Sequence, residues 1–193
     1  MKLFATMYDK CMTAAEHKRA PTILSILSFA ESSFFPIPPD VMLAPMAMRL
    51  PNKAFWFAFL TTLFSVLGGV AGYAIGYFAF DLISDWLQTT QYWQSYLHAR
   101  EWFQEWGVWV IFIAGFSPIP YKLFTITAGV MVQPLLPFVI ASFIGRGSRF
   151  FLVAGLLKYI GPRIEPMLLK YIEWLGWLFV LLLGIAIFWI SNH

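Results

Sequence analysis

Five ionisable residues stand in stretches of this chain that are otherwise apolar. Glu31, Asp40 and Lys122 lie close to pairs of prolines, and Arg146 and Arg149 lie within a long apolar segment. A helix places the two arginines, three residues apart, on one face. Carboxylates and guanidinium groups in such surroundings pair with each other, bind phosphate or carry protons. The predicted chemistry is therefore ion or phosphate binding inside an apolar protein.

The composition places these charges in a membrane. Of the 193 residues, 60% are hydrophobic and 12% are charged, which leaves too little polar surface for a soluble fold of this size. The basic residues behind the net charge of +3 are scattered, so we expect no nucleic-acid partner. The three histidines and the single Cys11 are not spaced like metal ligands or like a catalytic nucleophile and its base. We therefore expect neither an enzyme nor a metal or other cofactor.

Three segments are long and apolar enough to cross the hydrocarbon layer as helices, which takes about 20 residues. They are residues 54–80, 135–159 and 168–190. Residues 1–20 carry apolar side chains at helical spacing among charges. This N-terminal segment is either an amphipathic helix on the membrane surface or a polar terminus without regular structure.

Between these segments the phrase Pro-Ile-Pro occurs twice, formed by Pro36 and Pro38, followed by Pro39, and by Pro118 and Pro120. Proline ends a helix because it lacks the backbone donor and clashes with the preceding turn. Apolar arms of nine to fifteen residues, too short to span, flank both phrases. The arms are residues 21–35, 41–50, 108–116 and 123–132. We therefore expect two re-entrant hairpins whose tips are the prolines.

The two halves repeat, because Pro118 follows Pro36 by 82 residues and Lys122 follows Asp40 by the same distance. One crossing separates the hairpins, so the second must enter from the opposite face. The predicted fold is an all-α integral membrane protein of two inverted repeats, each a hairpin plus a transmembrane helix. Its units are an N-terminal amphipathic segment 1–20, a core 21–159 with repeats 21–80 and 107–159 joined by an interfacial connection 81–106, and a C-terminal transmembrane helix within 160–193.

Basic residues fix the expected orientation. Nine of the thirteen Lys and Arg precede the first span or lie from residue 158 to residue 170, where the second span ends and the third begins, and the positive-inside rule then places the N-terminus in the cytoplasm. On the first span Gly68, Gly72 and Gly76 recur every four residues, a spacing that lets another helix approach closely.

The buried charges allow two interpretations that are compatible with each other. Glu31 and Asp40 can neutralise Arg146 and Arg149 with no ligand present, or the arginines, with Lys122, can bind a phosphate. Either acid can also couple a proton to transport. Glu31 is the preferred proton carrier, because Asp40 is placed to cap the helix that follows the prolines.

Four parts of the chain resemble the DedA family, which is the VTT-domain or SNARE-associated Golgi protein superfamily, and its shorter YqaA-like branch in particular. They are residues 29–40, 68–76, 115–122 and the pair Ala128-Gly129. The resemblance covers about residues 21–159 and implies two inverted re-entrant hairpins in the bacterial cytoplasmic membrane. It also implies movement of phospholipid or polyprenyl phosphate, which in bacteria is linked to undecaprenyl phosphate recycling, the proton-motive force and envelope homeostasis.

By this resemblance Glu31 and Asp40 match the family's functional acids, and Arg146 and Arg149 match its later basic residues. The chain departs from the family where Lys122 stands near the second proline phrase, because better-known members carry arginines there. We therefore expect a flippase-like or scramblase-like transporter of a lipid phosphate. The alternatives are a proton-coupled ion or small-solute carrier and a structural membrane-assembly protein. The oligomeric state is left open, a homo-oligomer included.

Overall fold

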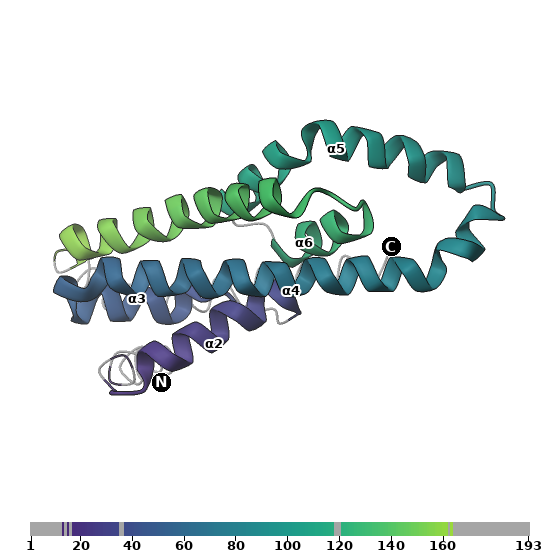
Figure 1. Cartoon of the computed structure of the whole chain (residues 1–193). Coiled ribbons are helices and arrows are strands. Elements are labelled where there is room, and N and C mark those ends of the chain that lie inside the picture. The colour runs from purple at the N-terminus through teal and green to yellow at the C-terminus, as the bar shows by residue number, and fades with distance from the viewer. Residues whose placement is uncertain are drawn as a thin grey trace, which may run out of the picture.

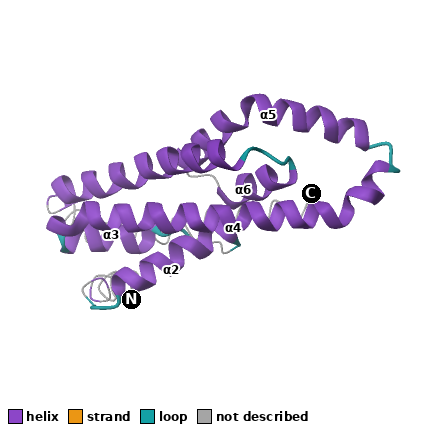
Figure 2. Cartoon of the chain, in the orientation of Figure 1, coloured by secondary structure: helices purple, strands orange, loops and turns teal. Residues whose placement is uncertain are grey.

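The computed structural model describes residues 13, 15, 17–34, 37–117, 121–161 and 163. Within these ranges every regular element is a helix (Figure 2). The elements are α2 (Ala20–Ser33), α3 (Asp40–Arg49), the 3-10 helix η1 (Pro51–Lys53), α4 (Ala54–Gln88), α5 (Trp93–Phe116), α6 (Tyr121–Val130) and a last helix, Leu135–Gly161. Three of the predicted tip prolines (Pro36, Pro118 and Pro120), most of the N-terminal segment and the predicted C-terminal span lie outside the described residues.

Prolines set several helix boundaries. Pro39 is the N-cap of α3, Pro51 opens η1, and Pro134 directly precedes the last helix. This position suits proline, whose missing N–H would have no partner in the first turn of a helix. The arms α2 and α3 have 14 and 10 residues, so the short helices predicted on each side of the first proline phrase are present.

Among the described residues, two helices are long and apolar enough to cross a membrane, covering Pro51–Leu82 and Leu135–Gly161. They agree with the predicted spans 54–80 and 135–159, and the all-helical class is confirmed. Helix α4 continues to Gln88 and α5 covers Trp93–Phe116, so both extend into the connection 81–106, and the predicted short arm 108–116 is the end of a 24-residue helix (Figure 1). No Gly or Pro occurs from residue 77 to residue 106, so nothing in this stretch forces a helix to end early.

Figure 1 shows that the chain reverses direction between α2 and α3, and again between α5 and α6. Ser28 Oγ donates to the Thr61 carbonyl at 2.6 Å, and the hydroxyls of Ser32 and Ser65 are 2.7 Å apart. Both pairs are 33 residues apart, so α2 runs along α4 in the same direction. The Phe112 carbonyl oxygen of α5 packs against Gly145 of the last helix. These two residues are also 33 positions apart in the sequence, as are the paired residues of α2 and α4.

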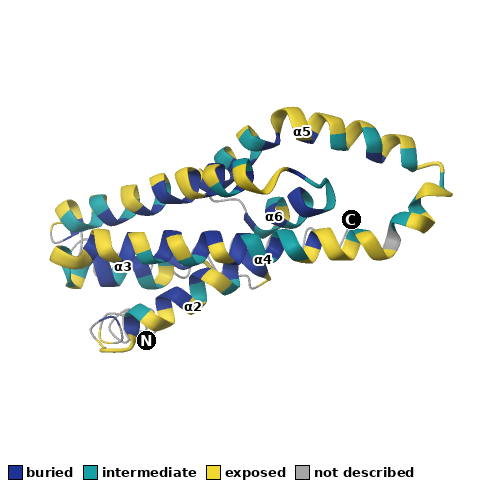
Figure 3. Cartoon of the chain, in the orientation of Figure 1, coloured by how far each residue is buried: buried dark blue, intermediate teal, exposed yellow. Residues whose placement is uncertain are grey.

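The last helix runs antiparallel to α4, because Gly147 lies beside Thr62 and Gly155 lies beside Phe55. Two buried clusters follow from this arrangement (Figure 3). One joins α2, α3, the start of α4 and the end of the last helix. The other joins α5, α6 and the beginning of the last helix. The first cluster thus contains the two helices of the first reversal, α2 and α3, and the second cluster contains those of the second reversal, α5 and α6.

Candidate functional site

The three predicted packing glycines of α4 form a row on which both reversals rest. Gly68 faces the backbone carbonyl of Phe29 in α2, and Gly76 faces that of Ile126 in α6. A Cβ at either position would collide with that carbonyl oxygen, so only glycine permits these approaches. The row therefore holds one arm of each reversal against the middle of one helix.

Arg146 and Glu31 form a buried ion pair near Ser65, which precedes Gly68 on α4 by three residues. Arg146 Nη2 lies 2.5 Å from Glu31 Oε2, and Arg146 Nε donates to Ser65 Oγ at 2.6 Å. Ser32 Oγ also donates to Glu31 Oε2, at 3.0 Å. Arg146 is 1% exposed and Glu31 is 8% exposed. A charge removed from solvent to this degree is stable only when it is paired and hydrogen-bonded, which both groups are.

Two aromatic rings lie against the same guanidinium. Arg146 Cζ lies 4.9 Å from the centroid of the Tyr121 ring and 4.7 Å from that of Phe150. The Tyr121 hydroxyl donates to Ser142 Oγ, which fixes the ring. Cation–π contacts gain strength when water is excluded. Arg146 is thus held by polar groups and by two aromatic rings, and it links α2, α4 and the last helix.

A second ion pair, Arg149 with Asp40, is more open. Arg149 Nη2 lies 2.7 Å from Asp40 Oδ2, and the side chains are 20% and 24% exposed. The prediction that Asp40 caps a helix is wrong, because Asp40 is the first residue of α3 after the N-cap Pro39 and its carboxylate bonds Arg149 instead. The other oxygen, Asp40 Oδ1, is buried without a hydrogen-bond partner.

A cation lies at the C-terminal end of each helix that leads into a chain reversal, here called the incoming arms, α2 and α5. Phe34 is the C-cap of α2, and Lys122 Nζ lies 3.4 Å from its carbonyl oxygen. Ser117 is the C-cap of α5, and Arg149 Nη1 donates to its carbonyl at 2.9 Å. A positive group at this end of a helix opposes the negative end of the helix dipole. Lys122 and Arg149 therefore lie at the two reversals. Arg146 is buried in the interior, so the three predicted phosphate ligands do not form one group.

Comparison with known proteins assigns the sequence to a family. A model of the VTT domain matches residues 37–159. The chain belongs to the VTT-domain family. An uncharacterized protein of Haemophilus influenzae is 50% identical over 192 residues, covering 100% of both chains, and one of Histophilus somni is 47% identical over 182 residues, covering 94% of this chain and 95% of the relative. No solved structure matches the chain.

The match confirms the resemblance drawn from the sequence, and together with the two apolar helices it identifies a membrane protein. The VTT-domain match contains Asp40, Lys122, Arg146 and Arg149 but begins after Glu31. Helix α2 nevertheless supplies the partner of Arg146 and packs along α4. The structural unit of this VTT-domain protein therefore extends toward the N-terminus beyond the matched residues.

The polar and aromatic groups around the ion pair of Glu31 and Arg146 were not predicted from the sequence. Ser25, Ser28 and Ser32 recur at the spacing of one helix face and are all buried. Thr61 and Ser65, four residues apart on α4, meet that face. Small hydroxyl residues on one face of an apolar helix are typical of close helix contacts in membranes, so this signal was available. Tyr121 and Phe150 gave no comparable signal among the many aromatic residues.

Proposed function

We propose that this VTT-domain protein moves a phosphate-bearing lipid, such as undecaprenyl phosphate or a phospholipid, across the bacterial cytoplasmic membrane. The observation that carries the proposal is the partly exposed Arg149, which bonds Asp40 and the end of α5, together with the half-buried Lys122, which bonds the end of α2. Two accessible cations thus lie at the two chain reversals. Anionic headgroups are the ligands that such cations recognise in an apolar protein.

The proposal includes two re-entrant hairpins that enter from opposite faces. Helices α2, α3 and α6 are about 21, 15 and 15 Å long, shorter than the hydrocarbon thickness of about 30 Å, whereas α5 is about 36 Å long and begins before the predicted arm. The starts of α3 and α6 differ by 81 residues, as do the starts of α4 and the last helix. Contacting residues are also 33 positions apart both between α2 and α4 and between α5 and the last helix, which further supports the repeat. Because the two spans are antiparallel, equivalent arms point in opposite directions.

Within this proposal Arg149 and Lys122 hold the phosphate, and Arg146 fixes the helices that carry them. Arg146 is 1% exposed and engaged by polar groups and two aromatic rings, which leaves it poorly placed for a ligand. Arg149 can exchange the Asp40 carboxylate for a phosphate, because the planar fork of a guanidinium suits both. Lys122 adds a point charge with three donors.

Asp40 is better placed than Glu31 to couple a proton to this exchange. The Asp40 side chain is 24% exposed and can exchange a proton with solvent, whereas that of Glu31 is 11% exposed and its Oε2 accepts from both Arg146 and Ser32. Asp40 Oδ1 has no hydrogen-bond partner and is free to take the proton. Protonation of Asp40 would weaken its pairing with Arg149 and release the guanidinium for phosphate. Deprotonation would return Arg149 to Asp40 and favour release of the lipid.

The test is transport in vesicles that contain the purified protein and fluorescent undecaprenyl phosphate or a labelled phospholipid. The fraction of label accessible from outside reports movement between leaflets. We expect Arg149→Gln combined with Lys122→Gln to reduce the rate at least about tenfold, the effect of losing about 1.4 kcal/mol of interaction in the rate-limiting state. The control is Lys158→Gln, because Lys158 contacts the rings of Phe55 and Tyr159 away from both reversals.

Two results would overturn the proposal. Lipid movement that persists at the wild-type rate in the double variant would remove the assigned roles of Arg149 and Lys122. A sodium- or proton-dependent current without lipid movement would show an ion or small-solute carrier instead.

A further inference from the structure

A hollow of about 400 Å³ lies at the end of the molecule where α2 and α4 begin. His17, Lys18 and Lys53 form its basic part, and Leu50, Trp56 and Phe57 contribute much of its apolar part. None of its lining residues, all of which the structure describes, is acidic. Phe57 is 2% exposed, whereas the three basic side chains are exposed, so the hollow combines an apolar floor with a basic rim.

The hollow is separate from the candidate site. Lys53 precedes Ser65, which bonds Arg146, by twelve residues, a distance of about 18 Å along a helix. Lys53 also lies within the first residues of the apolar span Pro51–Leu82. A hollow at the end of a span lies at the level of lipid headgroups, where Trp and Lys side chains are favoured.

The first turns of α2 and α4 strengthen the positive character of the hollow. Neither helix has an acidic residue in its first turn or a side-chain cap, and Pro21 and Lys53 at these ends line the hollow. The amino ends of helices attract anions, so they add to the charges of Lys18 and Lys53.

We propose that this hollow binds the phosphate of an anionic phospholipid from the adjacent leaflet. Lys18 and Lys53 contact the phosphate, and the glycerol and upper acyl chain lie against Leu50, Phe57 and the exposed Trp56. A free phosphate ion has no group to place against the apolar floor, which is why the chemistry favours a lipid. Because the hollow is on the side predicted to be cytoplasmic, it meets the leaflet whose anionic lipids attract basic residues.

Native mass spectrometry of the full chain in detergent tests the proposal, because it counts bound lipids and gives their affinities. Phosphatidylglycerol is the anionic probe, and phosphatidylcholine is the zwitterionic comparison. We expect Lys18→Gln combined with Lys53→Gln to weaken phosphatidylglycerol binding at the tightest site at least about tenfold, because both cations that contact the phosphate are lost.

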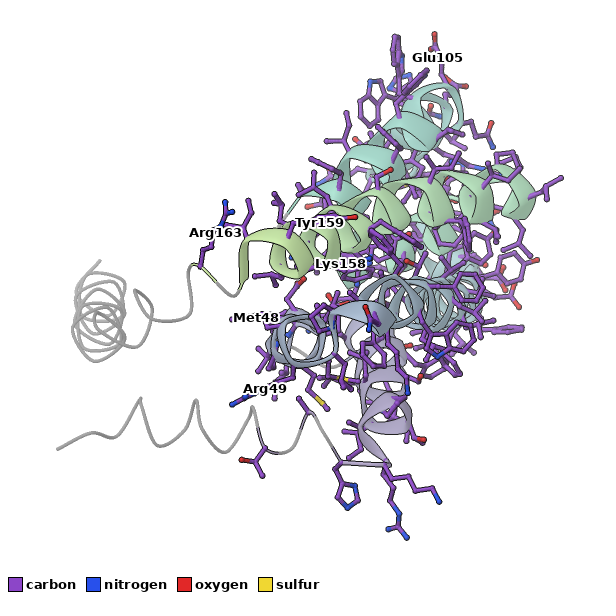
Figure 4. The ribbon with its side chains drawn as sticks, turned by 90° about the vertical axis from the view of Figure 1, so that its left-hand side faces the viewer. Met48, Arg49, Glu105, Lys158, Tyr159 and Arg163 are labelled. Carbon is purple, nitrogen blue, oxygen red and sulfur yellow. The ribbon has the colours of Figure 1, made fainter. Side chains whose placement is uncertain are left out.

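The matched control is Lys158→Gln combined with Arg163→Gln, which removes two charges from the same end of the molecule (Figure 4). Neither residue lines the hollow, and we expect this control to change the affinity less than threefold. Equal losses in the two double variants would overturn the proposal, because they would indicate a general charge effect. Wild-type binding without preference for phosphatidylglycerol, or displacement of the lipid by millimolar inorganic phosphate, would also overturn it.

Discussion

Thr125 Oγ1 donates to the carbonyl oxygen of Ser32 at 3.3 Å, and both groups lie against Gly72 of α4. Ser32 belongs to the incoming arm of the first reversal, and Thr125 belongs to the outgoing arm of the second. The two reversals therefore touch each other and the same point of one helix. Their relative position depends on how closely each approaches the glycine row.

Gly76→Ala should separate α6 from α4, because the new Cβ would collide with the backbone carbonyl of Ile126. We expect a loss of about 1–3 kcal/mol, the usual effect of overpacking, measured as a lower thermal unfolding midpoint in detergent. Gly147→Ala is the matched control, because its Cβ would meet nothing closer than Thr62 Cγ2 at 3.5 Å. That change should be neutral or stabilising by up to about 1 kcal/mol. Equal effects of the two substitutions would contradict the described packing.

Arg146→Met should destabilise the protein by about 3–5 kcal/mol, because it leaves the Glu31 carboxylate buried without its cation. Adding Glu31→Leu to the same protein should restore most of the lost stability, since an apolar pair needs no charge partner. Arg149→Met tests the more exposed pair, which we expect to contribute about 1 kcal/mol or less. Unfolding midpoints of the three variants check this order, and a double variant no more stable than Arg146→Met would contradict it.

Cysteine labelling should place the two repeats in opposite orientations. Asn52 and Pro134 are exposed at the starts of the two antiparallel spans, so their cysteine variants should react from opposite faces of the membrane. The native Cys11 is first replaced by Ala so that each protein carries one thiol. A membrane-impermeant maleimide applied to sealed vesicles, before and after permeabilisation, gives the result. Labelling of both positions from one side would rule out the inverted arrangement.

Gln133→Met should leave stability unchanged or raise it by about 1 kcal/mol. The Gln133 side chain is buried, at 1% exposure, and neither its nitrogen nor its oxygen has a hydrogen-bond partner. Burying an unpaired amide is unfavourable, and methionine has a similar shape without that requirement. The exposed Gln104→Met is the control and should change stability by less than about 0.5 kcal/mol. A clear destabilisation by Gln133→Met alone would show that the amide has a partner.

The parts of the fold that could be predicted are those set by local constraints. Pro39 limits the backbone wherever it occurs, so the helix start beside it followed from the sequence. The two spans followed from the length of apolar sequence. That α4 and α5 continue into the interfacial connection 81–106 could not be predicted in the same way, because its charges and aromatic residues suit helices that lie on a membrane surface as well as helices that extend from the membrane.

The candidate site was predictable in its charges but not in its assignments. Pairing of the two acids with the two arginines was one of the two interpretations of the sequence, and the structure joins Glu31 to Arg146 and Asp40 to Arg149. Which acid meets which arginine depends on how α2 and α3 lie against the last helix, and composition carries no information about that. The same dependence explains why Arg146 is enclosed while Arg149, three residues later, stays open.

Helix α4 has 35 residues and is about 52 Å long, which exceeds the hydrocarbon thickness by about 20 Å. Such a helix must tilt or extend beyond the bilayer. Because Gly68 supports α2 and Gly76 supports α6, a rotation of α4 about its own axis loosens or tightens both supports together. One rigid helix would thereby move the two reversals together, and the thickness of the host bilayer would set the tilt of that helix.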